Sequence, residues 1–201
     1  MEFSSEERIE FYKNIVNVKV SFKIDIPLDF EKLYSSLLVK HLNKLLVKKI
    51  RNMIIVKNGS ESYILMCSKN HSYPPYSYHC NITGIKDIPS ISNVNEKVQK
   101  IFIENSSIKN TEIQIDNITS KYEFGQNIDL RHIYSSLKEE DLISNKKLNL
   151  HTFPSLKLKF NNFGTANLYR SGKVLFLGQK SISETLMVKC ILFSILNKIE
   201  T

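Results

Sequence analysis

Apolar and polar residues alternate with a period of two over several short stretches of this chain, and turn residues separate those stretches. The clearest case is residues 153–180, where alternating apolar and basic positions are interrupted at 161–164 and at Ser171 and Gly172. A period of two is typical of β-strands, and breaks at Gly and Asn are typical of tight turns. We therefore predict a meander of three short strands in this region.

One segment of the chain occurs twice. Residues 17–37 and residues 117–137 align without a gap: both begin with Asn, share an Asp and end with Tyr-Ser-Ser-Leu, and their apolar positions fall in the same phase. Identity and phase together over a whole segment indicate a tandem duplication. We predict an N-terminal extension at residues 1–13, a first repeat at 14–105 and a second repeat at 106–201.

Each repeat is predicted to open with a strand, at about residues 14–25 and 111–124, followed by an amphipathic helix that Asp29 or Asp129 caps. The Asn58-Gly59 pair predicts a hairpin between two further strands of the first repeat. A long loop at 69–79, a strand at 80–86 and a helix at about 93–103 complete this repeat. Apolar positions predicted to face inward are Phe30, Leu33, Leu37, Leu38, Leu42 and Leu45 in its first helix, and Val94, Val98, Ile101 and Phe102 in its second.

The second repeat is predicted to end in a helix at about 183–198, because Ser181 and Glu184 stand at capping-box spacing. Two such repeats predict an α+β fold with one antiparallel sheet of about ten strands and two helices per repeat on one face. Apolar residues beside lysines on the uncovered face usually mark a contact surface. The residues on that face are Phe153, Tyr169, Leu175, Leu177, Lys157, Lys159, Lys173 and Lys180.

Composition and charge narrow the possible partners. The 201 residues are 42% hydrophobic and 24% charged, with a net charge of +8 and a pI near 9.3, which favours a polyanionic partner. The N-terminus is acidic and lacks the apolar core of a signal peptide, and we expect no membrane segment. The three cysteines, Cys67, Cys80 and Cys190, cannot all pair within one chain, so a reducing compartment is expected.

Motifs for catalysis or cofactor binding are absent. The sequence has no Gly-rich phosphate loop, no HExxH and no GxSxG, so we expect no enzyme and no cofactor. Four side chains that can bind zinc do lie close together, Cys67, His71, His79 and Cys80. Adjacent His79 and Cys80 are poorly spaced for a tetrahedral site, and we expect no metal there.

Three motifs in the second repeat carry a family resemblance. Residues 153–156 read Phe-Pro-Ser-Leu, residues 169–174 read Tyr-x-Ser-Gly-Lys-Val, and residues 178–180 read Gly-x-Lys. In this order and spacing they resemble the second repeat of the TATA-box-binding protein family, and the resemblance extends over about residues 14–199. It implies a saddle of two pseudo-symmetric repeats with one curved sheet and its helices on the convex face. It also implies binding of double-stranded, A·T-rich promoter DNA from the minor groove, with apolar wedges that kink the duplex.

The resemblance assigns roles to single residues. Phe153 and Tyr169 match wedge positions, and the first-repeat wedges fall near Ile50 and near Met66 or Cys67. The remaining positions are two base-contacting asparagines with a neighbouring threonine, four phosphate-contacting lysines, a groove-floor leucine and a leucine at the position of the second-repeat threonine: Asn17, Asn117, Thr83, Lys86, Lys159, Lys173, Lys180, Leu175 and Leu177. Ordinary structural roles are the alternative, with the asparagines bonded only to backbone, the aromatic rings in the core and the lysines solvated.

Several positions depart from the family pattern. Tyr169 replaces a phenylalanine, Leu177 replaces a threonine, Asn167 and Thr119 stand at apolar positions, and no glutamates precede Phe153 where the family recruits transcription factor IIB. The function implied is that of a general transcription initiation factor that bends promoter DNA and nucleates the preinitiation complex. Its partners would be factors similar to transcription factors IIA and IIB and the RNA polymerase machinery, in the nucleus or, for a viral relative, in a cytoplasmic viral factory. The alternative is a protein-interaction module of the transcription machinery with weak or partner-dependent DNA binding.

Overall fold

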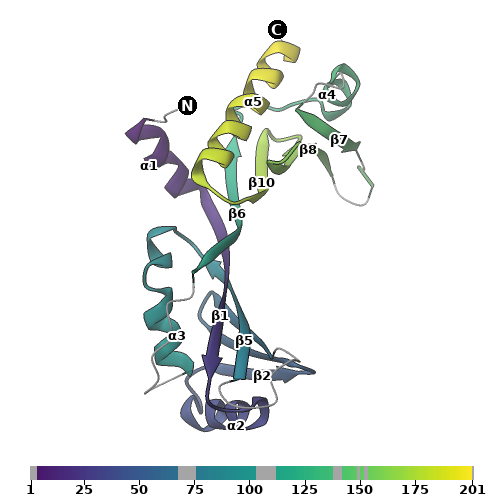
Figure 1. Cartoon of the computed structure of the whole chain (residues 1–201). Helices are drawn as coiled ribbons and strands as arrows, with labels where there is room; N and C mark the ends of the chain where they lie inside the picture. Colours follow the sequence, from purple (N-terminus) through teal and green to yellow (C-terminus); the bar gives the residue numbers. More distant parts are fainter. Residues whose placement is uncertain are drawn as a thin grey trace. The chain divides into compact units, whose positions relative to one another are not determined.

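A computed structural model of the chain describes residues 4–67, 76–102, 112–137, 142–148, 150–151 and 154–200. These residues contain a ten-stranded antiparallel sheet with the order β2-β3-β4-β5-β1-β6-β10-β9-β8-β7, together with five α-helices (Figure 1). The predicted α+β class and strand number are confirmed. Across the described residues, no helix combines the length and apolar character that a bilayer crossing requires.

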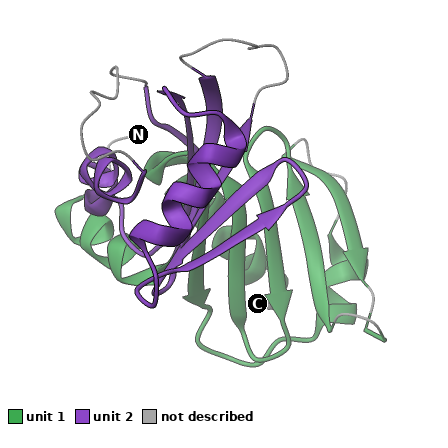
Figure 2. Cartoon of the chain, turned by 90° about the horizontal axis from the view of Figure 1, so that it is seen from below, with its two compact units in different colours: residues 1–16, 116–201 green, residues 17–115 purple. Residues whose placement is uncertain are grey.

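The chain divides into two compact units (Figure 2). We call residues 17–115 the first half, and residues 1–16 together with 116–201 the second half. The first-half elements, of which β1 begins just before the unit, are β1 (Ile15–Ile26), α2 (Phe30–Lys40), β2 (Leu46–Ile50), β3 (Met53–Asn58), β4 (Glu61–Cys67), β5 (Tyr76–Ile85), a 3-10 turn (Pro89–Ile91) and α3 (Val94–Phe102). The second-half elements, of which β6 begins just before residue 116, are α1 (Ser5–Asn14), β6 (Gln114–Glu123), α4 (Leu130–Ser136), β7 (Ile143–Leu148), β8 (Ser155–Phe160), β9 (Gly164–Tyr169), β10 (Lys173–Gln179) and α5 (Ile182–Glu200).

The core of the first half lies between one face of its strands and its helices. On this face β1 buries every second residue, from Val18 to Ile26. The ring of Tyr63 in β4 meets the ring of Phe102 in α3 edge to face at 6.3 Å, so α3 covers this face of the strands. The four positions predicted to face inward from α3 are all buried, which confirms that part of the pattern.

The core of the second half has the same arrangement. One face of β8, β9 and β10 packs against the apolar stripe of α5, with Leu158, Phe176, Val188 and Leu192 among the fully buried residues. Burial of large apolar side chains of this kind stabilises the fold by roughly 1.5–3 kcal/mol for each side chain. The three strands and the C-terminal helix were all predicted from the sequence.

Helix α2 is shorter than its apolar pattern suggested. Leu33 and Leu37 are buried, but Leu38 is 39% exposed and Leu42 is 71% exposed, so the prediction that both face inward is wrong. The helix stops at Lys40 because the buried His41 caps it: the His41 ring nitrogen Nε2 lies 2.9 Å from the carbonyl oxygen of Ile101. Beyond this anchor, Leu42 no longer follows the helical stripe.

The predicted loop at residues 69–79 is partly wrong. Residues 76–79 belong to β5, because the Tyr78 side chain is buried in the core and its hydroxyl donates to the Leu28 carbonyl at 2.8 Å. The rest of that loop lies outside the described residues.

Helix α1 was not anticipated, since residues 1–13 were expected only as an extension. A capping box starts it: the Ser4 hydroxyl accepts from the Glu7 N–H, and the Glu7 carboxylate accepts from the Ser4 N–H. Phe11 is fully buried, and Glu10 pairs with Lys189 of α5 at 3.0 Å. The helix therefore packs against α5 within the second half.

Candidate nucleic-acid interface

Each half leaves one face of its strands uncovered by its own helices, and we call this its open face. In the second half, strand pairing aligns Lys121, Leu175, Asn167 and Lys157 in one row across β6, β10, β9 and β8. A neighbouring row joins Leu177, Thr165 and Lys159. Because side chains alternate along a strand, these residues lie opposite the buried row of Phe176, Ala166 and Leu158.

The open face of the first half has corresponding rows. One runs through Thr83, Ser62 and Lys57, and the next through Ser21, Asn81, Ile64, Ile55 and Lys48. A third row contains Lys23, His79, Met66, Met53 and Ile50. The named rows contain three lysines in each half, and those of the first half carry more thioether and aliphatic groups.

The two predicted base-contacting asparagines occupy equivalent positions. Asn17 in β1 accepts a hydrogen bond on Oδ1 from the N–H of Gly84 at 2.6 Å, and Asn117 in β6 accepts one from the N–H of Gly178 at 2.5 Å. In both halves the strand register shifts at this point: Ile82 and Ile85 flank one bulge, and Phe176 and Gln179 flank the other. The backbone N–H that each bulge releases from the ladder is satisfied by the asparagine.

This bond fixes the orientation of each amide group. An N–H donor must face the oxygen, so the Nδ2 amine is turned the other way. The Asn117 amine donates to Thr119 Oγ1 at 3.1 Å and retains a second N–H. Both asparagines therefore keep at least one side-chain N–H that is not used by the backbone bond. Structural hydrogen bonds account for the two oxygens and for one N–H of Asn117.

Glycine is required at the first of these bulges. Gly84 has a φ of +89°, and a Cβ added there would lie 2.0 Å from the backbone oxygen of Ser60. Only a residue without a side chain fits this approach. The Gly-x-Lys motif of the sequence therefore contributes to the position of Asn17, and the equivalent Gly178 also has a positive φ of +87°.

The predicted phosphate-contacting lysines are all exposed. Among the described residues, none of their four ammonium groups makes a hydrogen bond or an ion pair; they belong to Lys86, Lys159, Lys173 and Lys180. By contrast, Lys121 pairs with Glu123 at 3.4 Å, and Lys189 pairs with Glu10. The four lysines are available to an anionic partner.

The predicted wedge positions differ between the halves. Tyr169 is half-buried at the end of β9, opposite Ser155, and Phe153 lies outside the described residues. In the first half the register makes Met66 the counterpart of Tyr169, in agreement with one of the two predicted positions. The counterpart of residue 153 is Arg51, one residue beyond the predicted Ile50, because Ile50 pairs with Met53 across a two-residue turn.

Two of the groups considered for zinc, His79 and Cys80, do not converge. His79 and Cys80 are neighbours on β5, so their side chains point to opposite faces: His79 is exposed on the open face and Cys80 is buried in the core. Burial raises the pKa of the Cys80 thiol, which disfavours the thiolate that a metal requires. His71 lies outside the described residues.

Two features of the site were not predicted. Asn167 is only 7% exposed, and its Oδ1 has no hydrogen-bond partner among the described residues. A cavity of about 590 Å³ lies beside α4, lined by Asn127, Ile128, Asp129, Leu130, Arg131, Leu150, Pro154 and Arg170. The Asp129 carboxylate at its edge accepts from the N–H groups of Arg131 and His132, which lower its pKa.

Comparison with known proteins gives two matches. Residues 112–199 match the model of the family described as transcription factor TFIID, or TATA-binding protein (TBP). The solved structure of Methanococcus jannaschii TBP matches with a TM-score of 0.69 at 19% sequence identity, over 92% of this chain and 98% of that chain. No curated protein matches the sequence. The structural likeness shows the fold, and the family match covers most of the second half.

Proposed function

We propose, from the match of residues 112–199 to the model of the TATA-binding protein family, that the chain binds A·T-rich double-stranded DNA from the minor groove and bends it. The family is one of DNA-binding factors and not of enzymes. The observation that carries the proposal is the matched pair of asparagine amides at the bulges of β5 and β10. Their oxygens are held by Gly84 and Gly178, which leaves the amines as donors.

Donors are the groups that suit the minor groove of A·T pairs. Adenine N3 and thymine O2 are acceptors, and only a G·C pair adds a donor there, from the guanine amine. The amines of Asn17 and Asn117 would each donate to one of these acceptors. The neighbouring hydroxyl of Thr83 can act in the same way.

Binding energy would come mainly from the exposed lysines. Lys86, Lys159, Lys173 and Lys180 have no counter-ion among the described residues, so each can contact a phosphate without first breaking an ion pair. Phosphate contacts position a protein on DNA and do not read its sequence. Preference for A·T-rich sites would then follow from the asparagine contacts and from the easy deformation of TA steps.

The open face also supplies apolar groups that can contact the sugar and base edges of the groove floor. Leu175 and Leu177 in β10 and Tyr169 at the end of β9 are all half-buried. The Tyr169 ring, with Phe153 from the adjoining segment, would enter a base step and kink the duplex. On this proposal the bent complex is the platform for initiation, and factors similar to transcription factors IIA and IIB would join it before RNA polymerase.

The proposal is tested with two fluorescent duplexes that differ only in a central TATA-containing or G·C-rich segment. We expect tighter binding to the first duplex and a higher energy transfer between dyes at its two ends, because bending shortens that distance. The paired variants are Lys159→Gln on the open face and Lys198→Gln at the end of α5; only the first should weaken binding. Equal affinity for both duplexes without bending would contradict the proposal. Binding that appears only with an added transcription factor would favour the protein-interaction module.

A further inference from the structure

The two halves carry different chemistry at their wedge ends. The register identifies counterparts by counting from the two bulges: Leu177 pairs with Thr165, and Thr83 pairs with Ser62. Four residues further along the same strands lie Tyr169 and Met66. Their opposite neighbours across the next pair of strands are Ser155 and Met53.

Met66 is a poor substitute for an aromatic wedge. A planar ring replaces part of the stacking that a base step loses when it is opened. A thioether chain has no such face, and its flexibility must be restricted before it can insert. Met66 is in addition flanked by Met53 and His79 in the same row, so the first-half end carries flexible thioether side chains where the second half carries the Tyr169 ring.

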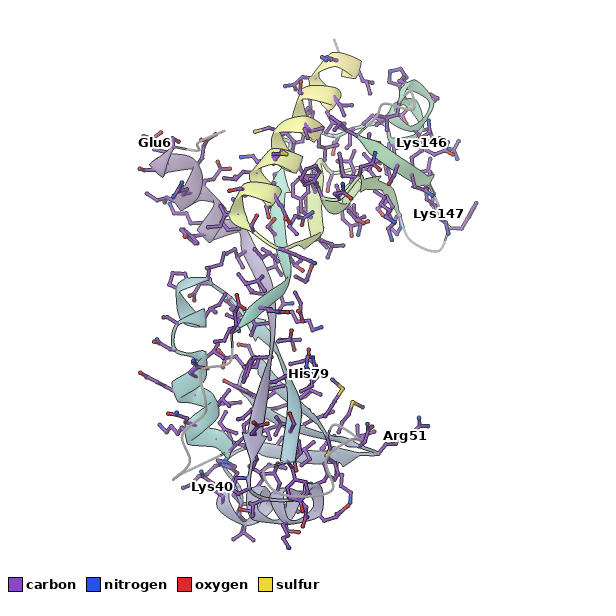
Figure 3. All side chains as sticks on the ribbon, in the orientation of Figure 1. Glu6, Lys40, Arg51, His79, Lys146 and Lys147 are labelled. Carbon is purple, nitrogen blue, oxygen red and sulfur yellow. The ribbon has the colours of Figure 1, made fainter. Side chains whose placement is uncertain are left out.

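The turn beside Met53 is short and basic. Only Arg51 and Asn52 join β2 to β3, whereas residues 149–155 separate Leu148 from its partner Leu156 in the second half. Arg51 has a φ of 52° and is exposed, and Figure 3 shows it at the tip of this hairpin with its side chain directed away from the strands. Among the described residues, Arg51 and the nearby Lys48 make no side-chain hydrogen bond or ion pair.

From this asymmetry, and resting on the proposed function, we propose that the first half holds its end of the DNA site by the phosphate backbone and opens no base step there. Arg51 is a phosphate contact at that end, assisted by Lys48. The duplex is kinked at the second-half end only, at Tyr169. A guanidinium can donate hydrogen bonds to two phosphate oxygens at once, and this bidentate contact does not require the DNA to be kinked.

The number of kinks is measured with duplexes that differ in where they carry flexible TA base steps. Three duplexes of equal A·T content carry a TA step at both ends of the site, at one end, or at neither, since TA steps open most easily. The chain can orient its second half on a single TA step, so the first two duplexes should bind within about twofold of each other. The third should bind about tenfold more weakly.

The role of Arg51 is measured by salt dependence. Arg51→Gln should reduce the slope of log affinity against log salt by about 1, and Arg51→Lys should keep it. Arg8→Gln, on the exposed side of α1, is the control that should leave the slope unchanged. The double variant R51F/M66F should create a second wedge, so that a second TA step improves its affinity by about tenfold.

The outcomes separate the two proposals. Binding that requires TA steps at both ends in the native chain overturns the one-ended kink. An unchanged salt slope in Arg51→Gln overturns the phosphate contact of Arg51. The proposed DNA-binding function stands in both cases. Absence of binding to all three duplexes refutes the proposed function, and the one-ended kink with it. Should R51F/M66F fail to fold by thermal melting, the Arg51→Gln slope and the native TA series still decide the inference.

Discussion

The side-chain oxygen of Asn117 lies 2.5 Å from the backbone nitrogen of Gly178 and accepts its hydrogen bond, joining β6 to the bulge of β10. Asn17 and Gly84 repeat this relationship in the first half. A single contact thus closes the bulge and turns the amine away from the glycine N–H. The bond to the glycine uses the oxygen, whereas the proposed contact with DNA would use an N–H of the amine.

Asn117→Asp tests that separation. The carboxylate still accepts from the Gly178 N–H, and only the amine bond to Thr119 is lost, so the melting temperature should fall only slightly. The donors are lost, and we expect affinity for an A·T-rich duplex to fall by about tenfold, as for one lost base contact. Fluorescence anisotropy over a salt series separates this loss from charge repulsion, which salt screens. Full recovery of affinity at high salt would show that the amine makes no base contact.

Gly84→Ala should destabilise the fold far more than Gly59→Ala. Both glycines have positive φ values, +89° and +59°, but an added Cβ meets the Ser60 oxygen at 2.0 Å in the first case and nothing within 4 Å in the second. Gly59→Ala should cost about 1 kcal/mol for the left-handed backbone alone. Gly84→Ala adds a displacement of the bulge, so its loss in free energy of unfolding should be at least about twice as large. Urea denaturation measures both, and equal losses would contradict the tight approach.

Asn167→Leu should stabilise the second half. The buried Oδ1 of Asn167 has no partner among the described residues, and its row neighbours are Leu175 and Lys157. Replacing an unsatisfied polar group by an apolar one of similar shape removes a desolvation cost of about 1 kcal/mol or more. The midpoint of urea unfolding should rise, whereas Asn167→Asp, which buries a charge, should lower it. A lower midpoint for the leucine variant would mean that the oxygen has a partner in solution.

The free energy of unfolding should fall at low pH, because the Asp129 carboxylate that caps α4 becomes protonated. Hydrogen bonds from the backbone N–H groups of His132 and then Arg131 lower the pKa of Asp129 in the folded chain. A carboxylate with a depressed folded pKa stabilises the fold above its unfolded pKa of about 3.9, and this stabilisation is lost as the pH falls through the folded pKa.

Asp129→Asn isolates that contribution, because asparagine is also a good N-cap but does not titrate there. The native chain should be the more stable of the two at neutral pH; the difference should begin to shrink as the pH falls below about 4 and should vanish below the lowered pKa of Asp129 in the folded chain. Thermal melts at a series of pH values measure it. A difference that is independent of pH would exclude the carboxylate as its source.

The sequence alone determined the local structure of this chain. The period-two pattern, the Gly and Asn turns, the two aspartate caps and the repeat at residues 17–37 and 117–137 are all encoded within short windows. They predicted the strands, most helices and the lysine-rich face, since hydrogen bonding and side-chain alternation act between near neighbours. The same local rule failed at Leu42, which lies beyond the helix end where His41 contacts α3, and at Leu38, which is exposed within α2.

Only the tertiary structure decided which residues meet. The Asn117–Gly178 bond joins residues 61 apart in sequence, and the Lys189–Glu10 pair joins residues 179 apart. The alternation of side chains along a strand predicts which face of the sheet each one occupies. It does not predict the partner residue on the next strand, because a bulge shifts the pairing register without changing the hydrophobic pattern. That register makes Arg51, and not Ile50, the first-half counterpart of residue 153, so the two halves carry different side chains at this position.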